Sequence, residues 1–281
     1  MFPDLGKKYI HIRKIGNGGT GVVNLAVDTH TGFQVAIKSL FKSHFENNPA
    51  MLERFKIEAN IYLMLSHPNI VKLKDLILKD GAHLVMDYVE GMTLEEYIRN
   101  VTGPIPSEVA IAIIKEIATA IGYAHQKQIP IPGYNGVLHL DIKPSNILIS
   151  SSGKVMVIDY GISQGSNEDR MDQIVGSLMY MAPEQLQSDT TLDHRTDIYA
   201  LGVLLHQMLT GTTPYSSKDT QYDIKWKIKN EPLDRLITIY THVDIRLQKI
   251  IDVATSKNPD KRFKNCEEFI NSLEMIDHAA N

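Results

Sequence analysis

The sequence predicts an α+β fold with two lobes, a small lobe built on an antiparallel sheet and a larger lobe built mainly from helices. Residues 1–88 contain short β-branched runs separated by glycine turns, with one helix among them. From residue 89 onward, in 89–281, apolar residues recur at three- and four-residue steps, which indicates helices. We therefore expect residues 87–91 to form a hinge, and a cleft between two such lobes is a natural ligand site.

The composition is that of an ordinary globular protein, and we expect residues 1–281 to form a single domain. Hydrophobic residues make up 43% of the chain and charged residues 22%. The net charge of −4 argues against a nucleic-acid-binding protein whose affinity depends on neutralising phosphates. No run approaches the roughly eighteen apolar residues that a membrane-spanning helix needs. A single cysteine, Cys266, fits a reducing compartment, so we expect a cytoplasmic protein in which Cys266 is buried as a small apolar side chain.

The small lobe is expected to consist of strands with one helix. Residues 12–15, 22–27 and 34–40 are β-branched runs, and Thr31 and Gly32 form a plausible hairpin turn before the last of them. Apolar residues at three- and four-residue steps predict a helix over residues 49–65, with proline in its first turn. Further strands are expected at residues 70–78 and 83–88.

The large lobe contains two clear helical patterns. Residues 107–125 carry an apolar stripe, and Ser107 is a candidate cap for that helix. Residues 196–210 are apolar almost all round, which is typical of a helix buried in the centre of a domain, and Gly211 would end it.

Glycines at positions 16, 18, 19 and 21 lie between two predicted strands. Glycines allow the backbone to turn tightly and to bring peptide N–H groups close to phosphate oxygens. The pattern alone is weak, because glycine-rich hairpins are common. A dinucleotide-binding loop is disfavoured because a strand follows the glycines, and a Walker A loop is excluded because no Gly-Lys-Ser/Thr closes the pattern.

A lysine and a glutamate in neighbouring elements form a possible ion pair. Lys38 ends a Val-Ala-Ile-Lys run in a strand, where lysines more often reach towards water. Glu58 lies on or near the apolar face of the following helix, although a solvent-exposed position remains open for it.

The sequence His-Leu-Asp-Ile-Lys-Pro-Ser-Asn at residues 139–146 decides the interpretation. Two short strands follow it and lead to an Asp-Tyr-Gly sequence at residues 159–161. Oxygen ligands from Asn146 and Asp159 suit Mg²⁺, with Mn²⁺ as a possible substitute. Asp141 can orient a hydroxyl and accept its proton, and Lys143 can offset charge on a phosphoryl group in transfer.

Taken together, these residues resemble the eukaryotic-type protein kinase family. The sequence around them is most similar to that of the family's bacterial members. The family's glycine-rich loop, strand lysine, helix glutamate, catalytic loop and metal-binding aspartate all occur in order. Ala-Pro-Glu at residues 182–184 completes the set, and the resemblance extends from about residue 9 to 273. It implies that Lys38 and Glu58 act with Asp141 and Lys143 in catalysis. It also implies that ATP is bound by Ile15, Gly16, Asn17, Gly18, Gly19, Thr20, Gly21, Val23, Ala36, Lys38, Met86, Asp87, Val89 and Leu148.

The resemblance also implies a structural core for the site. Tyr62, Leu73, His139 and Tyr160 would stack as an apolar spine that rests on Asp197. Arg262 would pair with Glu184. Leu140 stands where most regulated members have an arginine that receives a phosphate, and Tyr160 replaces a phenylalanine, so its hydroxyl requires a partner. Residues 127–136 form an insertion to which no function is assigned.

We expect a protein serine/threonine kinase, because Lys143 and Ser177 occupy the positions that are typical of that class. A pseudokinase that acts as a binding or scaffolding module is the main alternative. It would be favoured by the loss of Lys38, Asp141, Asn146 or Asp159, and all four are present. A small-molecule phosphotransferase is a further alternative, which the Ala-Pro-Glu sequence disfavours. The expected partners are ATP and protein substrates that carry serine or threonine.

Overall fold

The structure, a computed structural model, describes residues 5–18, 21–40, 49–79, 81–130, 136–160, 175–187, 190–216, 218–239 and 244–277. Contacts among these residues divide the chain into two compact units, the first ending at Glu90 and the second beginning at Gly91. The first is rich in strands and the second is mainly helical, so the predicted α+β class is confirmed. Within the described ranges, no helix has both the length and the apolar character required to cross a membrane.

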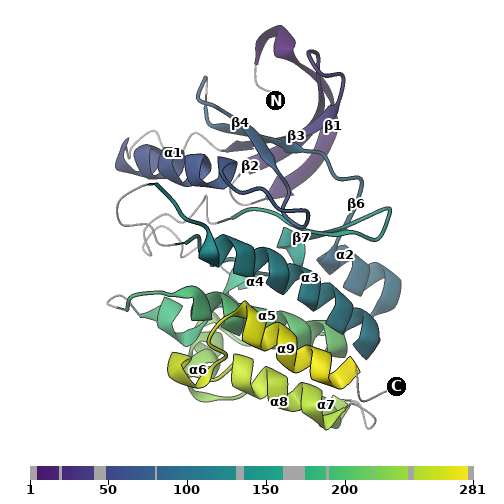
Figure 1. The fold of residues 1–281 in the computed structure, drawn as a ribbon, viewed down its shortest axis with the longest axis vertical. Coiled ribbons are helices and arrows are strands. Elements are labelled where there is room, and N and C mark those ends of the chain that lie inside the picture. The colour runs from purple at the N-terminus through teal and green to yellow at the C-terminus, as the bar shows by residue number, and fades with distance from the viewer. Residues whose placement is uncertain are drawn as a thin grey trace. The chain divides into compact units, whose positions relative to one another are not determined.

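The first unit is a five-stranded antiparallel sheet with the order β1-β2-β3-β5-β4, accompanied by one long helix (Figure 1). Its elements are η1 (Gly6–Lys8), β1 (Tyr9–Gly18), β2 (Gly21–Asp28), β3 (Gln34–Leu40), α1 (Pro49–Leu63), β4 (Leu73–Ile77) and β5 (His83–Asp87).

Strand β1 is longer than predicted, since it begins at Tyr9 and not at Ile12. Register shifts between His11 and Arg13 and between Lys14 and Gly16 break the alternation that marks a strand in sequence. One face of the sheet buries a cluster formed by Tyr9, Ala26, Val35, Ile37 and Val85. Strand β4 is shorter than predicted at its beginning, where the Ile70 amide donates to the carbonyl of His67 in a turn.

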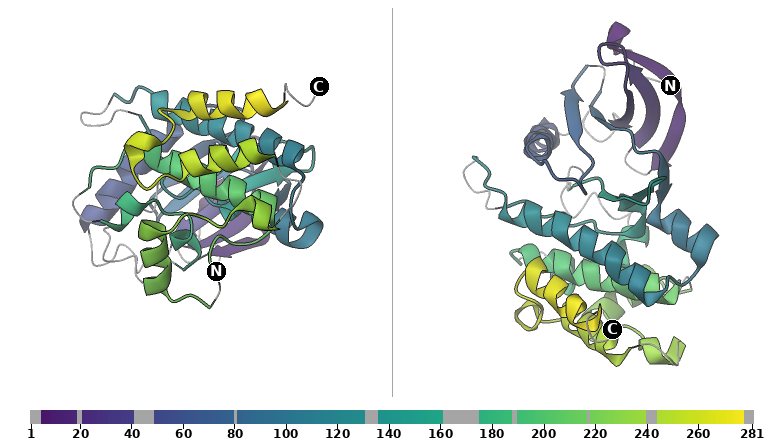
Figure 2. Two further views of the ribbon diagram at one scale, coloured as in Figure 1. Left: turned by 90° about the horizontal axis from the view of Figure 1, so that it is seen from below. Right: turned by 45° about the vertical axis from the view of Figure 1, so that its right-hand side comes forward.

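The second unit is built around long helices that run alongside one another, α3 with α5 and α9, and α5 with α8 (Figure 2). Its elements are β6 (Gly91–Thr93), α2 (Leu94–Tyr97), the π-helical turn η3 (Ile98–Thr102), α3 (Ser107–Gln126), η4 (Pro144–Asn146), β7 (Ile147–Ser150), β8 (Val155–Val157), α4 (Val175–Leu178), η5 (Pro183–Leu186), α5 (His194–Thr210), α6 (Gln221–Asn230), α7 (Leu236–Ile239), α8 (Ile245–Ala254), η6 (Pro259–Lys261) and α9 (Cys266–Asp277).

Helix α3 begins where it was predicted, but the proposed cap is wrong. Pro106 is the capping residue, and its carbonyl accepts the bond from the amide of Ala110. Ser107 is therefore already the first helical residue and does not occupy the capping position.

Helix α5 forms the centre of the second unit, as predicted. All of its residues from Thr196 to Thr210 are buried. Gly211 ends the helix with a φ of 70°, and a Cβ added there would lie 2.6 Å from the Pro104 nitrogen. Both the left-handed backbone and the close approach require glycine at this position.

Candidate active site

The hairpin of β7 and β8 brings Asn146 and Asp159 to the same end of one small sheet. Ile147 pairs with Val157, and the Ile158 amide donates to the carbonyl of Asn146 over 3.0 Å. Asn146 directly precedes β7 and Asp159 follows β8, so both predicted metal ligands belong to this end of the hairpin. Asp159 has a φ of 60°, a conformation that aspartate adopts more readily than most residues.

The donor set of Asn146 and Asp159 fits a magnesium ion that is held jointly by protein and phosphate. The amide nitrogen of Asn146 donates to the carbonyl of Asp141 over 2.8 Å and to Oδ2 of Asp141 over 2.9 Å. With the nitrogen engaged, the amide oxygen of Asn146 is the atom that can coordinate a cation. Among the described residues, no group of three His, Cys, Asp or Glu side chains could hold a metal. Mg²⁺ suits such a site because it commonly takes one or two protein ligands and completes its shell with water and phosphate oxygens.

Asp141 and Lys143 are in direct contact. Nζ of Lys143 lies 2.8 Å from Oδ2 of Asp141 and 2.6 Å from Oγ of Ser177 in α4. The side chains of Lys143 and Asp141 keep 20% and 33% of their surface exposed, so both remain accessible to a reactant. This arrangement places a carboxylate, an ammonium group and a hydroxyl within one hydrogen-bonded group.

Asp197, in α5, holds the backbone that leads to Asp141. Its Oδ2 accepts from the His139 amide over 2.8 Å, and its Oδ1 accepts from the Leu140 amide over 2.7 Å. Nε2 of His125 donates to Oδ2 over 2.8 Å. Asp197 is fully buried, and although burial acts to raise the pKa of its carboxyl, the hydrogen bond from His125 lowers that pKa below its usual value. An ionised carboxylate therefore secures the loop from inside the protein.

Two side chains of the predicted spine meet beside this loop. The rings of His139 and Tyr160 lie 4.7 Å apart between centroids, and Nε2 of His139 lies 3.0 Å from the Ile158 carbonyl. The Tyr160 hydroxyl donates to the carbonyl of Ala120 over 3.3 Å, so the partner that this substitution required is present. The other two predicted spine residues, Tyr62 and Leu73, are buried in the first unit.

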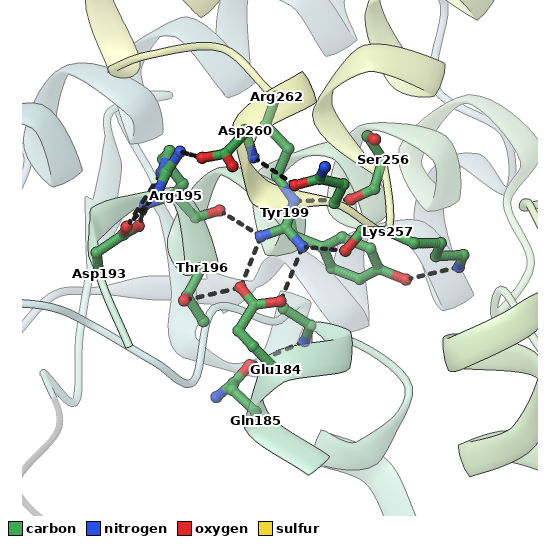
Figure 3. A network of polar contacts seen from close by, with 12 residues as sticks. Glu184, Gln185, Asp193, Arg195, Thr196, Tyr199, Ser256, Lys257, Asp260 and Arg262 are labelled. Atoms are coloured by element: carbon green, nitrogen blue, oxygen red, sulfur yellow. Dashed lines mark hydrogen bonds and ion pairs between the residues drawn. The ribbon is translucent and has the colours of Figure 1, made fainter. Parts of the chain in front are cut away.

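The predicted pair of Glu184 and Arg262 is confirmed (Figure 3). Nη1 and Nη2 of Arg262 lie 2.6 and 2.8 Å from the two carboxylate oxygens of Glu184, and Thr196 donates to the same carboxylate over 2.9 Å. Burial acts to raise the pKa of Glu184, but the hydrogen bonds and charge of Arg262 lower it below its usual value. Removing one partner of a buried pair of this kind costs about 3–5 kcal/mol.

The glycine-rich residues connect β1 and β2. Ile15, Gly16, Asn17 and Gly18 lie in β1, and Gly21 and Val23 lie in β2, whereas Gly19 and Thr20 lie outside the described residues. A Cβ added at Gly21 would lie 2.2 Å from the Ser39 carbonyl oxygen, so the close pairing of β2 with β3 requires glycine there.

The other predicted nucleotide residues of the first unit lie on adjacent strands. Ala36 and Met86 are buried partners in the pairing of β3 with β5, and Lys38 lies two residue pairs further along, opposite Val23 and Leu84. Asp87 ends β5 and pairs with Lys74, and Val89 follows it half-buried. Glu58 lies in α1, and its pairing with Lys38 stays a prediction. Leu148 lies in β7 of the second unit.

Sequence reasoning missed two residues that hold the site. His125 completes an apolar stripe with Ile117 and Ile121 at four-residue steps, and this spacing is the signal that could have marked it as buried. Gln185 bridges the loop and the Ala-Pro-Glu sequence, since its Nε2 donates to the Leu140 carbonyl over 3.2 Å and its Oε1 accepts from the Ala182 amide over 2.9 Å. No sequence pattern indicates the contact of Gln185 with Leu140.

These features find their match in a known family. The model of the protein kinase domain matches residues 9–273. The chain belongs to the protein kinase family. This family uses ATP and a divalent metal ion, and the predicted resemblance to bacterial serine/threonine kinases is confirmed.

Relatives of this kinase chain come from several bacteria. Probable serine/threonine-protein kinase PknB of Lactococcus lactis subsp. lactis is 35% identical over 271 residues, which cover 95% of this chain and 41% of the relative. Serine/threonine-protein kinase PrkC of Bacillus subtilis is 36% identical over 265 residues, covering 93% and 39%. The kinase chain thus spans about two fifths of the length of these relatives. The comparisons give no support to a pseudokinase.

The kinase fold is also that of solved structures. A crystal structure of the Mycobacterium tuberculosis PknI kinase domain aligns with a TM-score of 0.76 and 26% identity, covering 97% of this chain and 96% of that one. Another structure of the same domain aligns with a TM-score of 0.74 and 25% identity, with 96% of each chain covered.

Proposed function

We propose that the protein transfers the γ-phosphoryl group of ATP to serine and threonine hydroxyls of protein substrates, with Asp141 as the catalytic base. The observation that carries this proposal is the hydrogen-bonded group of Asp141, Lys143 and Ser177 on a loop that is fixed by Asp197. Asp141 orients the acceptor hydroxyl and takes its proton, and Lys143 offsets negative charge on the phosphoryl group.

The residues that bind the nucleotide are those of the first unit named above, together with Leu148. The glycine-rich backbone covers the phosphates, Ala36 and Val23 contact the adenine, and Lys38, held by Glu58, contacts phosphate oxygens. Asn146 and Asp159 hold the metal, for which we propose Mg²⁺, with Mn²⁺ as a substitute. Bound there, the ion neutralises charge on the phosphates.

The single cysteine supports a cytoplasmic site of action for this part of the protein. Because Cys266 is buried, the test uses a variant with one added exposed cysteine. A membrane-impermeant thiol reagent is applied to intact cells, which are then lysed and labelled again. Labelling of the added cysteine before lysis would contradict a cytoplasmic location.

The function is tested with ATP, Mg²⁺ and a generic protein substrate, followed by mass spectrometry of the products. We expect phosphoserine and phosphothreonine, and we expect Asp141→Asn to lower the rate by about 10²–10⁴-fold while ATP binding persists. Turnover within a few-fold of the wild type, or predominant phosphotyrosine, would contradict the assignment. Asp223→Asn, in the capping box at the start of α6, is the matched control and should keep its rate.

A further inference from the structure

The C-terminal helix α9 contacts the support of the catalytic loop through one side chain. Cys266 is the first residue of α9 and is 2% exposed, and its Sγ lies 3.8 Å from Nδ1 of His125 in the last turn of α3. At Gly122, a Cβ would lie only 3.1 Å from Cβ of Cys266. Because Gly122 has no side chain, α3 and α9 approach closely enough for the thiol to reach the imidazole ring.

The other nitrogen of this ring determines which group donates. Nε2 of His125 lies 2.8 Å from Oδ2 of Asp197, and an ionised carboxylate can only accept, so Nε2 carries a proton. In the neutral ring Nδ1 is then an acceptor, and the thiol of Cys266 is the donor that faces it. Burial, and then the charge of Asp197, raise the pKa of Cys266, so the thiol keeps the proton that it donates.

From this geometry we propose that Cys266 is a positioning residue for phosphoryl transfer, because its thiol, together with the carboxylate of Asp197, stabilises the Nε2–H tautomer of His125 that holds Asp197. The inference rests on the proposed function of Asp141. The contacts form a continuous series, from Cys266 to His125, from His125 to Asp197, and from Asp197 to the amides of His139 and Leu140.

The last member of this series shows why the orientation of Asp197 matters. Leu140 has a φ of 59°, a left-handed conformation that is unfavourable for a residue other than glycine. Such a conformation persists only where the surrounding contacts impose it. The bond from the Leu140 amide to Oδ1 of Asp197 is one of these contacts, and Asp141 is the next residue in the chain.

Loss of the thiol donor would release this arrangement. With no S–H facing it, Nδ1 could carry the proton, and the lone pair of Nε2 would then face the carboxylate of Asp197. That repulsion would turn the carboxylate and weaken its hold on the amides of His139 and Leu140. The nucleotide contacts proposed for the first unit involve none of these residues. Loss of the thiol should therefore lower kcat and leave KM for ATP unchanged.

The test compares Cys266→Ala, which removes the sulfur and its donor proton, with Cys266→Ser, which replaces the sulfur with a smaller hydroxyl that can still donate. Proton–nitrogen correlation spectra of the 281-residue chain labelled in its histidine rings report which nitrogen carries the proton, and His125→Gln assigns the signal. We expect Nε2–H in the wild type and in Cys266→Ser, and Nδ1–H to gain population in Cys266→Ala. We expect kcat to fall about two- to tenfold in Cys266→Ala, with recovery in Cys266→Ser and an unchanged KM for ATP.

A variant in the same helix controls for lost packing. Ile276 is buried in α9, about 15 Å along the helix from Cys266, so Ile276→Ala should lower the melting temperature and leave the His125 signal unchanged. Nδ1–H in the wild type would overturn the proposal whether or not the variants fold. So would an unchanged tautomer in Cys266→Ala, or equal losses of kcat in the Ala and Ser variants. An inactive wild type would contradict the proposed function, while the tautomer would still decide whether the thiol acts on His125.

Discussion

Strained backbone lies at or beside the residues proposed for catalysis and metal binding. Among the described residues, Leu140 and Asp159 are the non-glycine residues with positive φ, at 59° and 60°. One precedes the proposed base and the other is the proposed metal ligand. Conformations of this kind are concentrated at functional sites, where neighbouring contacts hold them in place. The two positions therefore support the site independently of any sequence pattern.

Asp159→Ala should weaken the binding of ATP in the presence of Mg²⁺ by at least roughly tenfold, because it removes a charged ligand of the ion. Titration calorimetry with ATP, with and without Mg²⁺, measures this change. Asp159→Asn is the matched variant, since it tolerates the left-handed backbone equally well and removes only the charge. Both variants should lose the metal-dependent part of the affinity. An affinity that stays unchanged in both would show that the metal binds elsewhere.

His206 predicts a pH dependence of stability. Its Nε2 lies 2.8 Å from the Asp234 carbonyl, and within the described part of the chain its buried Nδ1 has no hydrogen-bond partner. Burial lowers the pKa of His206, so the folded protein favours the neutral ring. Below a pH of about 6.5 the unfolded chain takes up a proton that the folded chain resists, and stability falls.

Urea unfolding at pH 7.5 and at pH 5.5 measures this effect against His206→Gln, which keeps a donor for Asp234 and does not titrate. The free energy of unfolding should fall more on acidification in the wild type than in the variant. Equal losses in the two proteins would mean that His206 is not the group responsible.

At the scale of elements, the sequence predicts where most strands and helices lie but not how they meet. A run that is apolar almost all round locates α5, and two short strands before the Asp-Tyr-Gly sequence locate the β7–β8 hairpin. Periodicity locates α3. It fails for β1, where two register shifts interrupt the alternation, and for Ser107, where Pro106 takes the capping position. Among site residues, Asp141 and Asn146 follow from local sequence. The contact of His125 with Asp197 joins residues 72 apart, and no local pattern encodes it.

The contact between α5 and α8 depends on one glycine. A Cβ added at Gly202 would lie 2.7 Å from Cβ of Ala254 and 2.8 Å from Cγ2 of Thr255. Overpacking of this kind costs about 1–3 kcal/mol, against a gain of about 1 kcal/mol in helix propensity. We therefore expect Gly202→Ala to lower the melting temperature in calorimetry.

The double variant Gly202→Ala with Ala254→Gly separates the two effects. It removes the nearest clash, so the two substitutions should couple favourably in a double-mutant cycle. A more stable Gly202→Ala protein would contradict the close approach of the two helices.

At the scale of the whole molecule, the question is what switches the kinase on. In members of the family with arginine at the position of Leu140, a phosphate on the activation loop pairs with that cation and orders the loop. Here the backbone of Leu140 is held by other means, since its amide donates to Asp197 and its carbonyl accepts from Gln185. The activation loop of this chain carries the acidic residues Glu168, Asp169 and Asp172, and Arg170 is one cation that could receive a loop phosphate instead of the missing arginine. All four lie outside the described residues.

Arg195 is a second candidate to receive a loop phosphate in place of the missing arginine, but it is already engaged in two ion pairs. Its guanidinium lies 2.7 Å from carboxylate oxygens of both Asp193 and Asp260 (Figure 3). The hydrogen bond to Asp193 and, to a smaller extent, the hydrogen bond to Asp260 raise the pKa of Arg195. A loop phosphate would have to displace both carboxylates to gain this cation, so Arg195 offers it little net attraction.

We therefore expect activity to be independent of loop phosphorylation. Enzyme treated with phosphatase and then assayed for its initial rate on an added substrate should retain the rate of the untreated enzyme. Leu140→Arg is the matched variant, because it restores the cation without changing the strained backbone, and its rate should come to depend on the phosphate. A fall of about tenfold in the treated wild type, about 1.4 kcal/mol in the barrier, with recovery on rephosphorylation, would show that another cation has replaced the missing arginine.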